Sequence, residues 1–187
     1  MKLIRKKSAL KILYYMMAAD GIITDTERST FDELGRIIDD RYDSYRNDIL
    51  WECRNIALTK PEGDPVFALL DMTARDLEDL SDVMTEDMIP GRLLVWNMLA
   101  IALCDKDYND GERRLIDEVR RKLELDEKDF LKMERTMQAE AAVGRQIAFL
   151  QTKIATNPDL APQLKNLKER RDIISANAKD MMVSRGE

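Results

Sequence analysis

The chain contains no histidine and has few glycines, prolines, cysteines and aromatic residues. The absence of histidine from 187 residues excludes Ser/His and Cys/His nucleophiles, histidine general bases and the commonest zinc sites. Seven glycines and five prolines are about half the average share of these turn formers. Because 35% of the residues are charged and 44% are hydrophobic, such a chain is expected to be mostly helical. The composition therefore predicts an all-α fold.

The cysteines and the apolar segments indicate a cytoplasmic protein. Cys53 and Cys104 lie in apolar helical patterns, as small reduced core residues of cytosolic proteins do. No stretch approaches the ~20 apolar residues of a membrane span. The basic start followed by ILYYMMAA is similar to a secretory signal, but its apolar run is short and contains two tyrosines. We therefore expect this segment to be a helix of the fold.

Charge is distributed unevenly along the chain. The net charge is −6, but the segment 131–187 holds ten basic and seven acidic side chains, which leaves the segment 1–130 at −9. An acidic body repels nucleic acid and attracts cations. We therefore expect no nucleic-acid partner. The basic residues near the start, such as Lys2 and Lys6, are expected to be solvated rather than to contact a membrane.

An internal repeat relates the segment 20–36 to the segment 105–121. Both contain the pattern D-x4-D-x-E-R-x3-D-E-x2-R, so that seven positions are identical and all seven are charged. The matched pairs are Asp20 and Asp105, Asp25 and Asp110, Glu27 and Glu112, Arg28 and Arg113, Asp32 and Asp117, Glu33 and Glu118, and Arg36 and Arg121. Agreement of this density predicts two related helix–loop–helix units.

Apolar stripes flank the repeated loops. The stripes before the loops are Leu10, Leu13 and Met17 and then Val95, Met98 and Ala102; those after the loops are Phe31, Leu34 and Ile38 and then Ile116, Val119 and Leu123. Their spacing is helical. Further helices are expected over 41–58 and about 65–80, with loops at 59–63 and 85–91. We predict one compact domain over residues 1–130 with two pseudo-symmetric repeats.

The segment 131–187 has a different pattern. Val143, Ile147, Leu150 and Ile154 are spaced by three and four positions, and a second series of this kind runs from Leu160 to Met181 with Arg171 interrupting it. This heptad-like spacing predicts a C-terminal helical hairpin or coiled-coil-like appendage. The hairpin either folds back on its own chain or forms an interface for a partner protein or a second copy.

The repeated acids have two alternative roles. Thr24-x-x-Glu27 and Asn109-x-x-Glu112 are capping-box patterns, and residues 28–36 and 113–121 alternate arginine and aspartate at a spacing of four, which favours ion pairs along each helix. Capping does not explain Asp20 or its counterpart, which follow apolar helices where the helix dipole disfavours a carboxylate. Because Asp20 and Glu27 both continue apolar stripes, a hard cation could compensate their repulsion.

The alternative role is therefore a Ca²⁺ or Mg²⁺ site, because these ions prefer oxygen ligands. The candidate metal ligands are Asp20, Asp25, Glu27, Asp105, Asp107, Asp110 and Glu112. The second loop is not an EF-hand, because Asp110 stands where glycine is required and Ile116 stands where a bidentate glutamate is required. No organic cofactor is expected. No nucleotide-binding or catalytic motif is present, so we expect no enzyme, although an acid-pair hydrolase is a third alternative.

The run from Leu13 to Glu27, LYYMMAADGIITDTE, resembles the TerB-like domain of tellurite-resistance proteins. In that family an apolar helix is followed by Ala-Asp-Gly, an apolar residue, a polar pair and a glutamate that opens the next helix. The second copy, from Ala102 to Glu112, is similar but has Lys106 in place of the glycine. The resemblance covers about residues 5–131 and implies a compact all-α fold with two pseudo-symmetric halves and metal-binding acids.

The resemblance also implies a role in tellurite resistance or another stress response. We therefore expect a non-enzymatic, cytoplasmic, TerB-like stress-response protein that binds a divalent cation and docks partner proteins through its C-terminal helices. A homodimer is one form that this docking could take. The alternative is a metal-free structural adaptor in a phage- or defence-related assembly.

Overall fold

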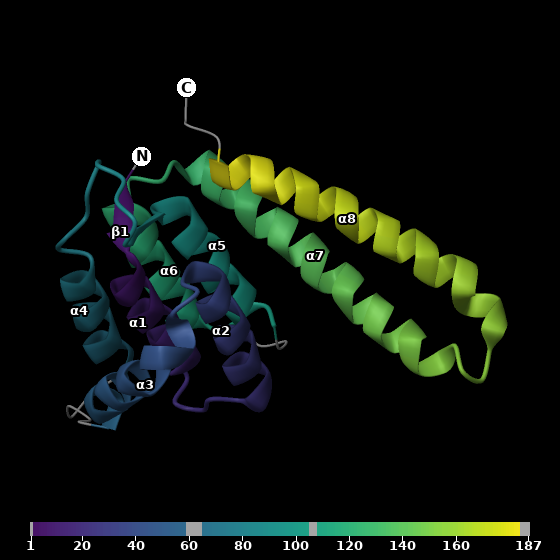
Figure 1. Ribbon diagram of the computed structural model, residues 1–187, viewed down its shortest axis with the longest axis horizontal. Coiled ribbons are helices and arrows are strands. Elements are labelled where there is room, and N and C mark those ends of the chain that lie inside the picture. Colours follow the sequence, from purple (N-terminus) through teal and green to yellow (C-terminus); the bar gives the residue numbers. More distant parts are fainter. Residues whose placement is uncertain (1, 59–64, 105–107, 184–187) are drawn as a thin grey trace. The chain divides into compact units, whose positions relative to one another are not determined.

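A computed structural model describes residues 2–58, 65–104 and 108–183, which form an almost entirely helical protein (Figure 1). The N-terminal unit, up to Asp126, contains β1 (Leu3–Arg5), α1 (Lys6–Met17), α2 (Asp25–Ile38), α3 (Tyr42–Leu58), α4 (Pro65–Asp76), β2 (Met88–Pro90), α5 (Gly91–Ala102) and α6 (Asp110–Lys122). The C-terminal unit, from Glu127, contains α7 (Glu127–Lys153), a short 3-10 turn (Pro158–Leu160) and α8 (Ala161–Val183). The predicted all-α class is therefore confirmed. No described helix has the length and apolar character needed to cross a membrane.

Helices α1 and α5 form the centre of the N-terminal unit. Eight of the twelve residues of α1 and nine of the twelve residues of α5 are buried. These two helices pack against each other, and α2, α3 and α4 pack around α1. A helix that is apolar nearly all round is stable only when other elements cover every side. The predicted stripe residues Leu10, Leu13 and Met17 are all buried in this core.

A two-stranded antiparallel sheet joins the starts of the two central helices. Ile4 pairs with Ile89, and each strand runs directly into a helix, β1 into α1 and β2 into α5. The loop expected at 85–91 is wrong for residues 88–91, which form β2 and the first residue of α5. A strand of three residues is too short to show an alternating pattern in the sequence. It forms here by pairing with β1, which lies far away in the sequence.

Corresponding elements begin at the same offset as the repeated sequence pattern, which is the separation between Asp20 and Asp105. The paired starts are Leu3 of β1 and Met88 of β2, Lys6 of α1 and Gly91 of α5, and Asp25 of α2 and Asp110 of α6. The N-cap residues Thr24 and Asn109 have the same offset.

Helix α4 ends at Asp76, earlier than the expected residue 80.

The described part of the C-terminal unit is a hairpin of α7 and α8, joined through the short 3-10 turn (Figure 1). The two helices pack along each other, and the Ser175 hydroxyl donates to a Glu140 carboxylate oxygen at 2.9 Å. The unit starts at Glu127, where α7 begins, so the boundary expected between residues 130 and 131 lies within the first turn of this helix. Arg171, which interrupts the heptad pattern, is exposed, so it needs no buried carboxylate partner.

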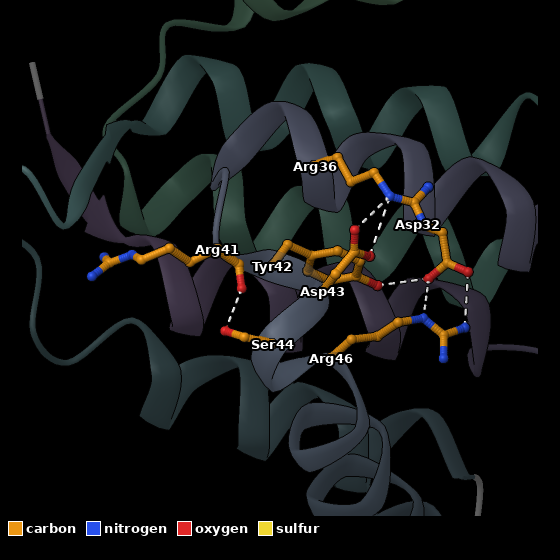
Figure 2. Close-up of polar contacts among 7 residues, drawn as sticks. All are labelled: Asp32, Arg36, Arg41, Tyr42, Asp43, Ser44 and Arg46. Atoms are coloured by element: carbon orange, nitrogen blue, oxygen red, sulfur yellow. Dashed lines mark hydrogen bonds and ion pairs between the residues drawn. The ribbon is translucent and has the colours of Figure 1, made fainter.

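A charged contact holds α2 against α3. One carboxylate oxygen of Asp32 accepts hydrogen bonds from the Tyr42 hydroxyl at 2.7 Å and from Arg46 Nε at 2.6 Å, and the other accepts from Arg46 Nη2 at 2.8 Å (Figure 2). Arg36 pairs instead with Asp43, at 3.2 Å from both carboxylate oxygens. The i, i+4 ladder expected at residues 28–36 is therefore wrong, because Asp32 and Arg36 bind residues of α3.

Burial opposes the ionisation of Asp32, but the hydrogen bonds from Arg46 and Tyr42 outweigh it and hold the pKa of this carboxyl below its usual value. A carboxyl whose pKa is lower in the folded than in the unfolded state stabilises the fold above its unfolded pKa. This stability is lost as the pH falls through the lower, folded-state pKa.

We expect Asp32→Asn to lower the free energy of unfolding by about 1.5–3 kcal/mol at neutral pH, because the negative charge and one of the two oxygens that accept from Arg46 are lost. The difference from the wild type should shrink as the pH falls below about 4, where unfolded aspartate becomes protonated. Urea denaturation at a series of pH values measures it. Asp43→Asn, in an exposed pair, is the matched control and should cost less than about 1 kcal/mol. A loss that is independent of pH would show that the charge of Asp32 is not what stabilises the contact.

Candidate functional site

The first acidic loop connects α1 to α2 and is organised by backbone hydrogen bonds. Asp20 accepts a hydrogen bond from the Ile22 amide at 2.8 Å, and Gly21 has a φ of +84°, in the left-handed region that favours glycine. The Asp20 side chain is exposed. The interpretation that Asp20 continues the buried stripe of α1 is therefore wrong. The chain leaves its helical path after Ala18, the C-cap of α1, so helical spacing no longer gives its direction.

Glu27 forms the expected capping box at the start of α2. Its carboxylate accepts hydrogen bonds from the Thr24 amide at 2.7 Å and from the Thr24 hydroxyl at 2.9 Å, and its own amide donates to Thr24 Oγ1 at 3.1 Å. The side chain is only 5% exposed. A buried carboxylate is costly unless donors surround it, and the cap supplies two of them. Asp25 lies exposed in the first turn.

The second copy repeats this geometry at the start of α6. Glu112 accepts from the Asn109 amide at 2.8 Å, and the Glu112 amide donates to Asn109 Oδ1 at 3.0 Å. Glu112 is 3% exposed, and Asp110 is exposed in the first turn. The positive end of each helix dipole therefore faces two carboxylates, one buried and one exposed. The capping role predicted for Glu27 and Glu112 is confirmed.

The structure brings the start of the first loop next to the first turn of α6. A Cβ added to Gly111 would lie 3.2 Å from the Ala19 carbonyl oxygen and 2.9 Å from Val66 Cγ2. A side chain at this position would crowd Val66 and the Ala19 carbonyl oxygen, so glycine favours the close approach of the first turn of α6 to the backbone beside Asp20. Residues from both copies of the acidic pattern therefore lie around one junction, which sequence spacing alone did not show.

This junction is the candidate cation site, and the structure describes five of its seven candidate ligands. Asp105 and Asp107 lie outside the described residues. Within the described ranges, no three acidic or cysteine side chains are grouped closely enough to hold a metal ion together. Among the described candidate ligands, Asp20, Asp25 and Asp110 are exposed, whereas Glu27 and Glu112 are buried.

A second polar cluster, which the sequence analysis missed, lies between α1, α3 and α4. The Tyr15 hydroxyl donates to Asp76 at 3.0 Å, and Lys11 forms an ion pair with Glu52. Burial raises the pKa of the Asp76 carboxyl and of the Tyr15 phenol. Burial likewise raises the pKa of the Cys53 thiol to about 12, so this thiol stays protonated and inert near neutral pH.

In the sequence, this cluster is indicated only by polar residues at regular spacing within the otherwise apolar helix α1. Lys7, Lys11 and Tyr15 follow one another at a spacing of four on α1 and so share one side of it. Their partners come from two other helices, and sequence spacing cannot identify contacts between helices. The cluster satisfies polar groups at the α1, α3 and α4 contact, and this makes it a structural element of the core.

Removing the caps tests the role of the repeated glutamates. We expect Thr24→Ala and Asn109→Ala each to lower the free energy of unfolding by about 1 kcal/mol, because each loses the acceptor for a first-turn amide. Chemical denaturation followed by circular dichroism measures the change. Thr26→Ala, at an exposed position of the same helical turn, is the control and should stay within about 0.5 kcal/mol of the wild type. Equal effects at Thr24 and Thr26 would contradict the capping role.

The described geometry thus assigns the repeated glutamates to helix capping and leaves the exposed aspartates accessible at the same junction. Burial of Glu27 and Glu112 fixes the direction of α2 and α6, and the exposed carboxylates extend the acidic surface of the N-terminal unit.

No family model, no curated protein and no solved structure matches the chain.

Proposed function

We propose that the chain is a non-enzymatic docking protein of the TerB-like, stress-response type, in which a helical body carries a partner-binding hairpin. The observation that carries the proposal is that large apolar side chains are exposed on helices whose surfaces are otherwise charged. In the N-terminal unit Trp51 is 72% and Phe67 64% exposed, and in the hairpin Phe149 is 62% exposed. Exposed aromatic side chains are enriched where proteins bind one another.

The TerB-like assignment is part of this proposal and rests on the resemblance of residues 13–27 and on the common offset of the elements. A strand, a central helix, an acidic loop and a capped helix occur twice, once from Leu3 and again from Met88, which is consistent with a pseudo-symmetric domain. A capping glutamate that is buried in both copies gives a structural reason for the repeated charged pattern.

The docking function predicts defined protein partners and no turnover. Full-length chain, captured from its own cells after mild cross-linking, should carry specific proteins that re-form the complex when each component is purified and mixed. Sedimentation velocity gives the stoichiometry of the reconstituted complex. A hydrolase activity that Asp20→Asn abolishes, with no complex formed from purified components, would replace this proposal with the acid-pair hydrolase.

Divalent-cation binding is the second candidate function, and one specific observation favours it. The Gly111 contact brings the backbone beside Asp20 next to the first turn of α6, where Asp110 is exposed. Carboxylates from both copies near one junction provide oxygen ligands of the kind that Ca²⁺ and Mg²⁺ use. The metal-free adaptor is the alternative that remains if these ions do not bind.

Cation binding should raise the melting temperature, because a ligand that binds only the folded state stabilises it. We expect an increase at about millimolar Ca²⁺ or Mg²⁺ relative to chelator at matched ionic strength, measured by differential scanning calorimetry. Asp20→Asn should remove most of this increase. Asp43→Asn, an exposed aspartate of α3, is the matched control and should keep it. Identical melting curves with metal and with chelator would favour the metal-free adaptor.

A further inference from the structure

The hairpin unit has an open groove between α7 and α8. It has a volume of about 510 Å³, and its lining includes Ala142, Arg145, Phe149, Leu150, Gln163 and Leu167. This volume is within the usual range for sites that take up a ligand or a few side chains. Phe149 is 62% exposed at this groove, and Leu167 is half-buried. Both helices of the hairpin therefore offer apolar atoms to an incoming chain.

The groove continues along one side of α7. Counting back from Phe149 in steps of three and four gives Arg145, Ala142, Gln138, Arg135 and Leu131. Positions with this spacing share one side of a helix, and from Leu131 to Phe149 they span about 27 Å. All of them are exposed except Ala142, which is partly exposed. This side of α7 thus has an apolar residue at each end and arginines between them.

The facing side of α8 has the same character. Gln163 and Leu167 line the groove, and the same spacing continues to Arg170 and Ile174. The charged residues among these ten positions on the two helices are Arg135, Arg145 and Arg170, and none is a carboxylate. Lys153 adds a further positive charge, because its ammonium lies 5.8 Å from the centroid of the Phe149 ring.

The charge around the groove is opposite in sign to that of the whole chain. The segment 141–171 contains six basic and two acidic side chains, a net charge of +4, whereas the complete chain has a net charge of −6. Within the described residues of the hairpin unit, the two helices form this groove without the third helix of a small bundle. A groove in which arginines lie between apolar side chains matches an amphipathic helix that carries both apolar residues and carboxylates.

We propose that the groove between α7 and α8 binds an acidic amphipathic helix of a partner protein as the third helix of a bundle. Apolar side chains of that helix pack on Phe149, Leu167 and Ile174, and its carboxylates pair with Arg135, Arg145 and Arg170. The inference rests on the proposed docking function and names the class of partner segment. A second copy fits less well, because two copies of this strip facing each other would bring arginines together.

Peptide binding to the full-length chain tests the proposal. The probe is a fluorescent helical peptide of about 20 residues, long enough to span the strip, with leucines at helical spacing and glutamates flanking them. One comparison peptide has lysine in place of every glutamate, and another keeps the glutamates but has serine in place of every leucine. We expect fluorescence anisotropy to show binding by the acidic amphipathic peptide on the order of micromolar, and much weaker binding by both comparison peptides.

Variants locate the binding. Phe149→Asp and Arg145→Glu should each weaken binding of the acidic amphipathic peptide at least about tenfold. Phe67→Asp is the matched control, because Phe67 is equally exposed, at 64%, but lies on α4 of the other unit; it should bind as the wild type does. Since these side chains are exposed, circular dichroism should show unchanged helicity in all three variants.

Four results would overturn the proposal. They are equal binding of the lysine peptide, equal binding of the serine peptide, no binding of the acidic amphipathic peptide at millimolar concentration, and a dimer in sedimentation that Phe149→Asp dissociates. The last result would assign the groove to a second copy. If a complex reconstituted from purified partners survives Phe149→Asp and Arg145→Glu unchanged, the docking function stands and only this groove is excluded.

Discussion

The N-terminal unit depends on the burial of two helices that are apolar on nearly every side. Most residues of α1 and α5 are buried, and the neighbouring helices of this unit pack against them. The strands β1 and β2 fix where these two helices begin, since each strand leads directly into one of them. The acidic sequence pattern begins after the other end of each of these helices.

The same constraint explains why a charged pattern repeats in a helical core. A helix that starts beside buried apolar residues needs acceptors for its first amides, and Glu27 and Glu112 belong to the boxes that provide them. Their burial is tolerated because each carboxylate accepts a hydrogen bond from the backbone amide of its N-cap residue. The exposed aspartates beside them are available for a second role. The hairpin, which is a separate unit, supplies a groove lined by apolar side chains and arginine.

The presence of the helices and their N-terminal caps could be predicted from the sequence, because both depend on the spacing of nearby residues. The buried stripes at Leu10 and Ile116 and the capping boxes at Thr24 and Asn109 are short-range patterns. Contacts between elements were not predictable in this way. Asp32 has arginines at suitable helical spacing on its own helix, yet it binds Arg46 of α3, because packing brings a bidentate partner closer than the flexible neighbours along the helix.

The sequence by itself determined the helical class, the recurrence of one charged pattern at Asp20 and Asp105 and the reciprocal caps, because each copy of these patterns depends on residues within a few turns of one another. Only the tertiary structure decided that Asp20 is exposed, that Gly111 admits the backbone of the first loop, and that α7 and α8 leave an arginine-lined groove. These features arise where helices distant in sequence meet, and the direction of a side chain there is set by packing rather than by helical period.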